Sequence, residues 1–106
     1  MTIEQQVYEF LMNHCKGKEN LIKNRTLMRL FNVRSDKSMR KIIQNIREDK
    51  QFTEVVGSVS GKTGGNYICV NDEEIQETIN NIKHRANEML RMCYVLEWKR
   101  TIKKLN

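Results

Sequence analysis

The sequence predicts an α+β fold that is mostly helical, with one β-hairpin and a long C-terminal helix. Apolar residues recur at helical spacing in the first 49 residues. The next stretch is β-branched and is interrupted by a cluster of glycines, which is typical of a two-stranded hairpin. From residue 72 a heptad spacing continues without a helix breaker. We therefore expect one globular domain over residues 1–71, followed by a helix over residues 72–106 that serves in dimerisation or packing.

The first helix is expected over residues 2–15. Thr2 and Gln5 have the spacing of a capping box, in which each side chain accepts a hydrogen bond from the other residue's backbone. A polar loop at residues 16–18 is expected to end this helix. The apolar residues at helical spacing within it are Ile3, Val7, Phe10 and Leu11.

A short second helix is expected to begin at Thr26, whose hydroxyl suits a helix cap. Residues 32–35 then indicate a tight turn. The apolar residues that share one side of the short helix are Leu27, Leu30 and Phe31.

A third helix is expected over residues 35–49, capped by Ser35 or Asp36. Its apolar residues form one stripe, which should face the core. The residues of that stripe are Met39, Ile42, Ile43 and Ile46.

The hairpin strands are expected over residues 52–60 and 66–70, joined by a loop with three glycines at 61–65. The order of helix, short helix, turn, helix and hairpin resembles the winged helix-turn-helix family. The resemblance covers roughly residues 2–71 and is carried by TLMRLFNVRSDKSMRKIIQNIRED and VVGSVSGKTGGNYICV. It implies three helices, a two-stranded wing and binding to double-stranded DNA. A helical tail after the wing looks like that of small proteins of bacteriophages and mobile elements, and the abundance of Lys, Asn and Ile fits such a source in an AT-rich host.

The charges of the chain also favour an anionic partner. The net charge is +6 and the isoelectric point is near 9.4, with the excess of basic residues in residues 1–71. An inward apolar stripe on the third helix turns Lys, Arg, Gln and Asn side chains outward, which suits the major groove of DNA, although such a face is also common on a merely solvated helix. The residues expected to contact DNA are Arg34, Lys37, Ser38, Arg40, Lys41, Gln44 and Asn45, with Lys62, Thr63 and Asn66 on the wing.

No catalytic constellation is recognisable, so we expect no enzymatic activity, no metal and no cofactor. Residues 57–63, GSVSGKT, approach the phosphate-binding loop motif but have three residues between the glycines where four are needed, and a strand follows. Cys15, Cys69 and Cys93 are far apart and odd in number, which fits free thiols in a reducing cytoplasm, here that of a bacterial host. No apolar run is long enough to span a membrane, and no membrane partner is expected.

The last 35 residues carry a heptad seam, which predicts pairing of two helices in a homodimer. A helix folded back on its own domain is the alternative. The residues of the seam are Ile75, Ile79, Ile82, Ala86, Met89, Cys93 and Leu96.

Together these features predict a sequence-specific DNA-binding protein, acting as a transcriptional regulator or as an origin-binding replication factor. The alternative, from a different functional class, is an adaptor on a winged-helix scaffold that binds a host or phage protein. RNA binding is disfavoured, because no exposed aromatic platform is evident.

Overall fold

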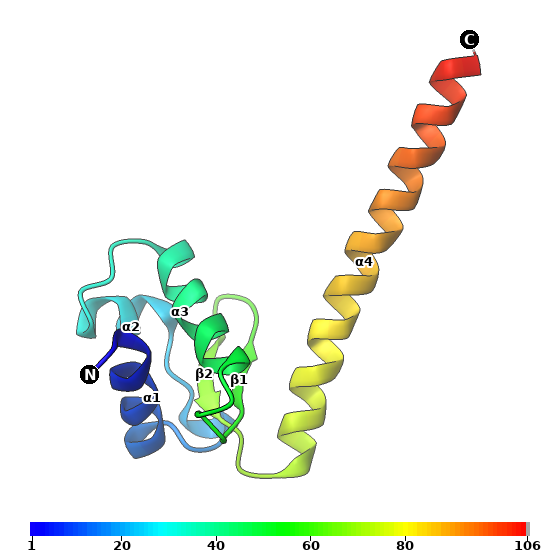
Figure 1. Cartoon of the computed structure of the whole chain (residues 1–106). Helices are drawn as coiled ribbons and strands as arrows, with labels where there is room; N and C mark the ends of the chain where they lie inside the picture. The colour runs from blue at the N-terminus through cyan, green and yellow to red at the C-terminus, as the bar shows by residue number, and fades with distance from the viewer. Residues whose placement is uncertain (106) are drawn as a thin grey trace. The chain divides into compact units, whose positions relative to one another are not determined.

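The computed structural model describes residues 1–105 and contains, in that range, four α-helices and a two-stranded antiparallel sheet (Figure 1). The predicted α+β class, mostly helical, is confirmed. The chain forms two compact units, Met1–Ile75 and Gln76–Asn106. The elements are α1 (Ile3–His14), the short 3-10 helix η1 (Lys18–Asn20), α2 (Asn24–Leu30), α3 (Asp36–Glu48), β1 (Val56–Val59), β2 (Gly65–Ile68) and α4 (Asp72–Leu105).

Helix α1 begins with the predicted capping box. The backbone N–H of Gln5 donates to Thr2 Oγ1 over 3.1 Å, and the N–H of Thr2 donates to Gln5 Oε1 over 2.9 Å. Val7 and Leu11 are fully buried, which gives the helix its inner face. This local pattern in the sequence is therefore sufficient to define the start and the rotation of α1.

The cap of helix α2 lies three residues earlier than predicted, so the helix begins at Asn24 and Thr26 lies exposed inside it. Lys23 is the N-cap residue and makes no side-chain capping bond. No local sequence signal marks this start, because the Asn24 side chain bonds to residues far along the chain. Of the predicted apolar side, Leu27 is fully buried, whereas Leu30 is exposed.

The turn between α2 and α3 is closed by two backbone hydrogen bonds. The N–H of Val33 donates to the carbonyl of Met28 over 2.9 Å, and that of Asn32 donates to the carbonyl of Arg29 over 3.4 Å. Asn32 has a φ of 53°, in the left-handed region that asparagine adopts more readily than most residues. This pattern is the Schellman motif, and it explains why the chain reverses sharply between the two helices.

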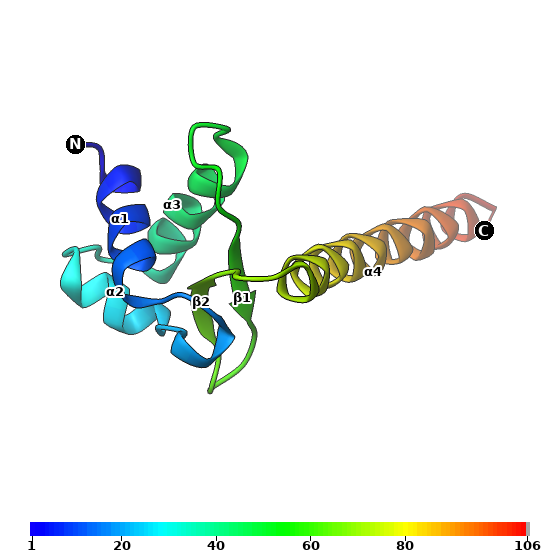
Figure 2. The same cartoon turned by 90° about the horizontal axis from the view of Figure 1, so that it is seen from below.

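Helix α3 is the centre of the first unit. Ser35 caps it by accepting a hydrogen bond from the N–H of Ser38 over 3.1 Å, one of the two predicted caps. The predicted stripe of Met39, Ile42, Ile43 and Ile46 is buried. α3 packs against α1, α2 and β1, so that the hairpin lies to one side of the three helices (Figure 2).

The hairpin strands are shorter than predicted. β1 and β2 pair from Val56 opposite Ile68 to Val59 opposite Gly65. Upstream of β1, Phe52 packs against the core with its ring centroid 4.8 Å from that of Tyr8, and the N–H of Glu54 donates to the Tyr8 hydroxyl. Phe52 and Glu54 are thus held by α1, whereas the Val55 carbonyl accepts the backbone N–H of Cys69, just beyond β2, over 2.9 Å.

The segment between α1 and α2 pairs with the free edge of β2, which the sequence did not predict. The N–H of Gly17 donates to the carbonyl of Ile68, and the N–H of Ile68 donates to the carbonyl of Cys15, each over 2.8 Å. Ile22 and Asn66 exchange two further backbone bonds of 2.8 Å. β2 therefore lies between β1 and this segment, which explains the burial of Asn66, Tyr67 and Ile68.

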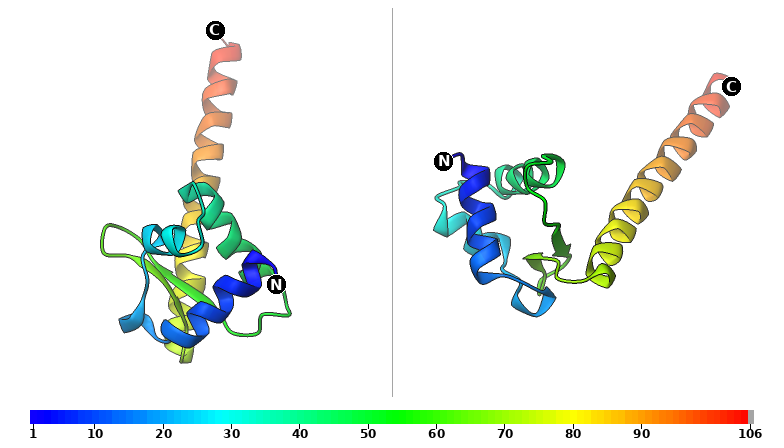
Figure 3. Two further views of the ribbon diagram at one scale, coloured as in Figure 1. Left: turned by 90° about the vertical axis from the view of Figure 1, so that its left-hand side faces the viewer. Right: turned by 60° about the horizontal axis from the view of Figure 1, so that its bottom comes forward.

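The first turn of α4 is fastened to the first unit by Glu74. Its carboxylate accepts the backbone N–H of Val70 over 2.9 Å and that of Lys18 over 3.0 Å, while Asn71 Oδ1 accepts the N–H of Glu74. These bonds favour the ionised carboxylate and hold the pKa of Glu74 below its usual value, with the Val70 bond the larger cause. Beyond residue 75, α4 continues as an uninterrupted helix (Figure 3). Among residues 1–105 no helix combines the length and the apolar character needed to cross a bilayer.

We expect Glu74→Ala to lower the urea midpoint of unfolding at pH 7 more than Glu73→Ala, which removes an equal charge from the same exposed turn. Because the pKa of Glu74 is lower in the folded chain, its contribution is present above the unfolded-state pKa and is lost as the pH falls through the folded-state pKa. The difference between the Glu74 variant and the wild type should therefore shrink in acid. Equal midpoints for the two variants at pH 7 would show that the Glu74 bonds are without effect.

Candidate nucleic-acid interface

The outer face of α3 carries cationic and amide side chains. Lys37, Arg40, Lys41 and Gln44 are all exposed and have the spacing i, i+3, i+4 and i+7, which places them on the side opposite the buried stripe. Burial of that stripe fixes the rotation of the helix, so these four side chains have a defined common direction. We call this set the α3 face.

The polar groups of the α3 face are held only by surface contacts. Arg40 Nε lies 2.8 Å from Asp36 Oδ2, and the two side chains are 70% and 54% exposed. Gln44 Nε2 donates to Glu48 Oε1 over 2.9 Å, also at the surface. Exposed pairs of this kind contribute little to stability, about 0–1 kcal/mol, so an anionic ligand can replace them at small cost.

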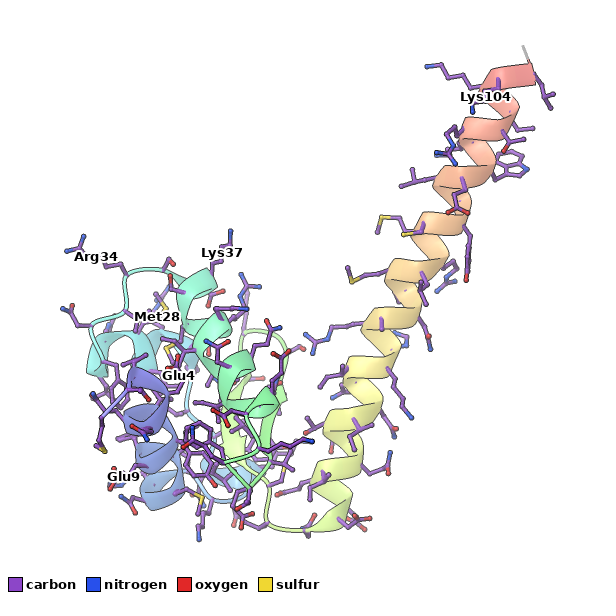
Figure 4. All side chains as sticks on the ribbon, in the orientation of Figure 1. Glu4, Glu9, Met28, Arg34, Lys37 and Lys104 are labelled. Atoms are coloured by element: carbon purple, nitrogen blue, oxygen red, sulfur yellow. The ribbon has the colours of Figure 1, made fainter. Side chains whose placement is uncertain are left out.

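The positive charge of this region lies toward the first turn of α3. Arg34 in the turn and Lys37 in the helix are exposed, and Figure 4 shows both side chains pointing outward at the same end of the α2–α3 pair. Glu48 closes the other end of the α3 face with a carboxylate. An anion should therefore approach the first half of the helix rather than its end.

Ser38 and Asn45, also predicted as contacts, have other partners. The Ser38 hydroxyl accepts a hydrogen bond from the Ser35 hydroxyl over 2.8 Å, within the helix cap. Asn45 is half-buried and its Nδ2 donates to Glu4 Oε2 of α1 over 3.3 Å. Asn45 is one residue beyond Gln44 and points about 100° away from it, at the edge of the α3 face next to α1.

The hairpin loop presents Lys62 and Thr63, which are both exposed as predicted for a wing tip. The N–H of Gly64 donates to the carbonyl of Gly61 over 3.1 Å, closing the turn, and Gly61 has a φ of 95° that favours glycine. A side chain at Gly64 would collide with the carbonyl of Val59. The two glycines thus give a compact loop with one lysine at its tip.

Asn66 does not have the exposed position that the sequence predicted. It is 6% exposed, in the middle of β2, and its Nδ2 donates to Asn24 Oδ1. Asn24 Nδ2 in turn donates to Asp36 Oδ1 over 3.1 Å, and Asp36 pairs with Arg40. This Asn66–Asn24–Asp36–Arg40 relay ties the hairpin to the first turns of α2 and α3.

Arg47 is a second tie between α3 and the hairpin that the sequence analysis missed. Its Nε donates to the Val56 carbonyl over 2.7 Å, and its Nη2 donates to the Ser58 hydroxyl over 3.0 Å. Arg25 and Arg29, exposed on α2, were also not predicted. The predicted second helix already contained Arg29, and the observed start at Asn24 adds Arg25 to the same helix, which packs next to α3.

Groups that support other chemistry are few in residues 1–105. No set of three or more His, Cys, Asp or Glu side chains is grouped there as a metal site. Cys15 and Cys69 are buried, and burial raises the pKa of the Cys15 thiol, which keeps it protonated and unreactive. No protein-family model, curated protein or solved structure matches the chain.

We expect Asn66→Ala to act on stability. The substitution leaves Asn24 Oδ1 without its donor, which should lower the free energy of unfolding by about 1–2 kcal/mol. Thr63→Ala, in the exposed loop three residues away, should change it by less than about 0.5 kcal/mol. Urea unfolding followed by circular dichroism measures both values, and an unchanged stability of the Asn66 variant would contradict the relay.

Proposed function

We propose that the chain binds double-stranded DNA as a winged helix-turn-helix protein and has no enzymatic activity. In this proposal α2, the turn and α3 are the helix-turn-helix, and the β1–β2 hairpin is the wing. The observation that carries the proposal is the α3 face, where three cations and one amide are exposed opposite a fully apolar inner stripe. A helix with such a face fits the width and the donor–acceptor pattern of the major groove.

The residues divide into two roles. Lys41 and Gln44, in the middle of α3, are the residues that read base edges, and a glutamine amide pairs in two points with adenine. Arg34, Lys37 and Lys62 lie at the turn, at the start of the helix and at the hairpin tip, where they bind phosphates and set the position of the protein. When DNA is bound, Arg40 leaves its ion pair with Asp36 and contacts a phosphate or a base instead.

The order of the elements supports the same assignment. The pairing of the segment before α2 with β2 anchors the hairpin, and Arg47 fixes β1 to the end of α3. A rigid link between the hairpin and α3 is what two-point binding to one duplex needs. We propose that the biological role is transcriptional regulation or origin binding, in a bacteriophage or mobile element.

A second candidate function, an adaptor for another protein, is favoured by one observation on α4. Tyr94 and Trp98 are 65% and 63% exposed, and exposed aromatic side chains are typical anchors of protein interfaces. This surface belongs to the second unit and has no residue in common with the α3 face. Variants of one surface therefore test DNA binding without altering the other.

Replacing Lys37 and Lys41 together by Glu should abolish binding to short duplexes at moderate salt. Each lysine that neutralises a phosphate contributes about 0.9 to the slope of log affinity against log salt concentration, so loss of both cations should also flatten that slope by up to about 2. The matched control is Lys16→Glu with Lys50→Glu, which changes the net charge equally at exposed positions off the α3 face. Fluorescence anisotropy across a salt series measures both effects. An equal loss in the control pair would mean that only net charge matters.

Selection of preferred sites from random duplexes should distinguish residues that recognise bases from residues that bind phosphates. Gln44→Ala should lose preference at one base pair, by roughly 1–3 kcal/mol, whereas Lys62→Ala should weaken all duplexes about equally. Asn45→Ala, at the neighbouring residue directed toward α1, should leave the preferred sequence unchanged. A preference altered by Asn45→Ala and not by Gln44→Ala would place the reading surface on another side of α3.

A further inference from the structure

The second unit is a single helix with an exposed apolar seam. Ile79, Ile82, Met89 and Leu96 are between 39% and 66% exposed, and Cys93 is exposed as well. Taken by itself, this part of α4 has no second element on which to bury the seam. We propose that the seam binds the same seam of a second copy of the chain, with the two helices antiparallel. This inference is independent of DNA binding.

The sizes of the seam residues favour the antiparallel direction. In a parallel, in-register pair, Ala86 would face Ala86 and Cys93 would face Cys93, so that small layers would alternate with large ones. In an antiparallel pair the first position of each heptad faces the fourth, which sets Ala86 opposite Met89 and Cys93 opposite Ile82. Each small side chain then meets a large one, and the layers fill evenly. Ile79 and Leu96 form the outermost apolar layer.

The charges along α4 favour the same direction. The first turns carry Asp72, Glu73, Glu74 and Glu77 without a basic residue, and the last turns carry Lys99, Arg100, Lys103 and Lys104. A parallel pair would place like charges together at both ends, which is unfavourable. In the antiparallel pair, with Ile82 opposite Cys93, Asp72 lies opposite Lys103. Side-chain size and charge thus both favour the antiparallel direction, and the register with Ile82 opposite Cys93 is the one that pairs the seam completely from Ile79 to Leu96.

The end of the seam agrees with this register. Four residues after Leu96, the position on the same side of the helix is Arg100 rather than an apolar residue. In the proposed pair Arg100 lies opposite Ile75, which is half-buried in the first unit. The apolar contact therefore extends from Ile79 to Leu96 in both copies and stops where the basic residues begin.

The natural cysteine at position 93 gives a direct test. In a parallel pair the two Cys93 thiols face each other within reach of a disulfide, which needs Cα atoms less than about 7 Å apart. In the antiparallel pair they are separated by 11 residues along the axis, or about 16 Å at the rise of an α-helix. The full chain should sediment as a dimer of the 12.6 kDa subunit and should not become cross-linked under mild oxidation.

Cysteine variants then identify the neighbour of Cys93. Ile82→Cys should cross-link the dimer through Cys93 of the other copy, and Ile82→Cys with Cys93→Ser should not. His84→Cys adds a thiol on the opposite side of the helix and should stay unlinked. A second pair, Ile79→Cys with Leu96→Cys in the Cys93→Ser background, should form the same kind of cross-link. The test therefore still gives a result if the Ile82→Cys substitution by itself weakens the dimer.

Other outcomes overturn the proposal. Efficient cross-linking of the wild type through Cys93 would show a parallel pair, and failure of both engineered pairs would show another interface. A species of 12.6 kDa that persists at tens of micromolar would show that the seam has no second copy as its partner. DNA binding by the α3 face is measured separately and is not decided by any of these results.

Discussion

Burial of Met39, Ile43 and Ile46 fixes the rotation of α3 about its own axis, and most of the surface chemistry follows from that rotation. With these three side chains inside, Lys37, Lys41 and Gln44 face solvent and Asn45 is directed toward Glu4. Full burial of an aliphatic side chain contributes about 1.5–3 kcal/mol, whereas an exposed ion pair such as Asp36–Arg40 contributes about 0–1 kcal/mol. The apolar stripe therefore determines the fold, and the charged side chains remain available for a ligand.

The relay from Asn66 to Arg40 adds a second constraint, which acts between elements. Asn24 bonds to β2 on one side and to α3 on the other, so the first turn of α2 cannot shift without breaking a bond at both places. Asp36 is the end of this relay and also the surface partner of Arg40. A ligand that binds Arg40 would break its ion pair with Asp36. The Asp36 carboxylate would still accept the hydrogen bond from Asn24, and this bond limits how far the first turn of α3 can move.

The features predicted from sequence are those whose signals are local. The capping box at Thr2, the Ser35 cap and the buried stripe of α3 each depend on residues within a few positions of one another, and all three agree with the structure. The start of α2 was missed because Asn24 has its partners 12 and 42 residues away. The burial of Asn66 was missed for the same reason, since it depends on backbone pairing with Ile22. Asn45 was predicted to contact DNA together with Gln44 but is directed toward Glu4, because adjacent residues of a helix point about 100° apart.

The length of α4 gives the proposed antiparallel pair a further property. In the register set by Ile82 and Cys93, the two copies of Ile75 lie 25 residues apart along the axis, or about 37 Å at the rise of an α-helix. Ile75 is the last residue of the first unit, and Glu74 beside it is bonded to Lys18 and Val70. The paired helices would thus act as a molecular ruler between two attachment points, and its length is close to the roughly 34–36 Å of one turn of DNA.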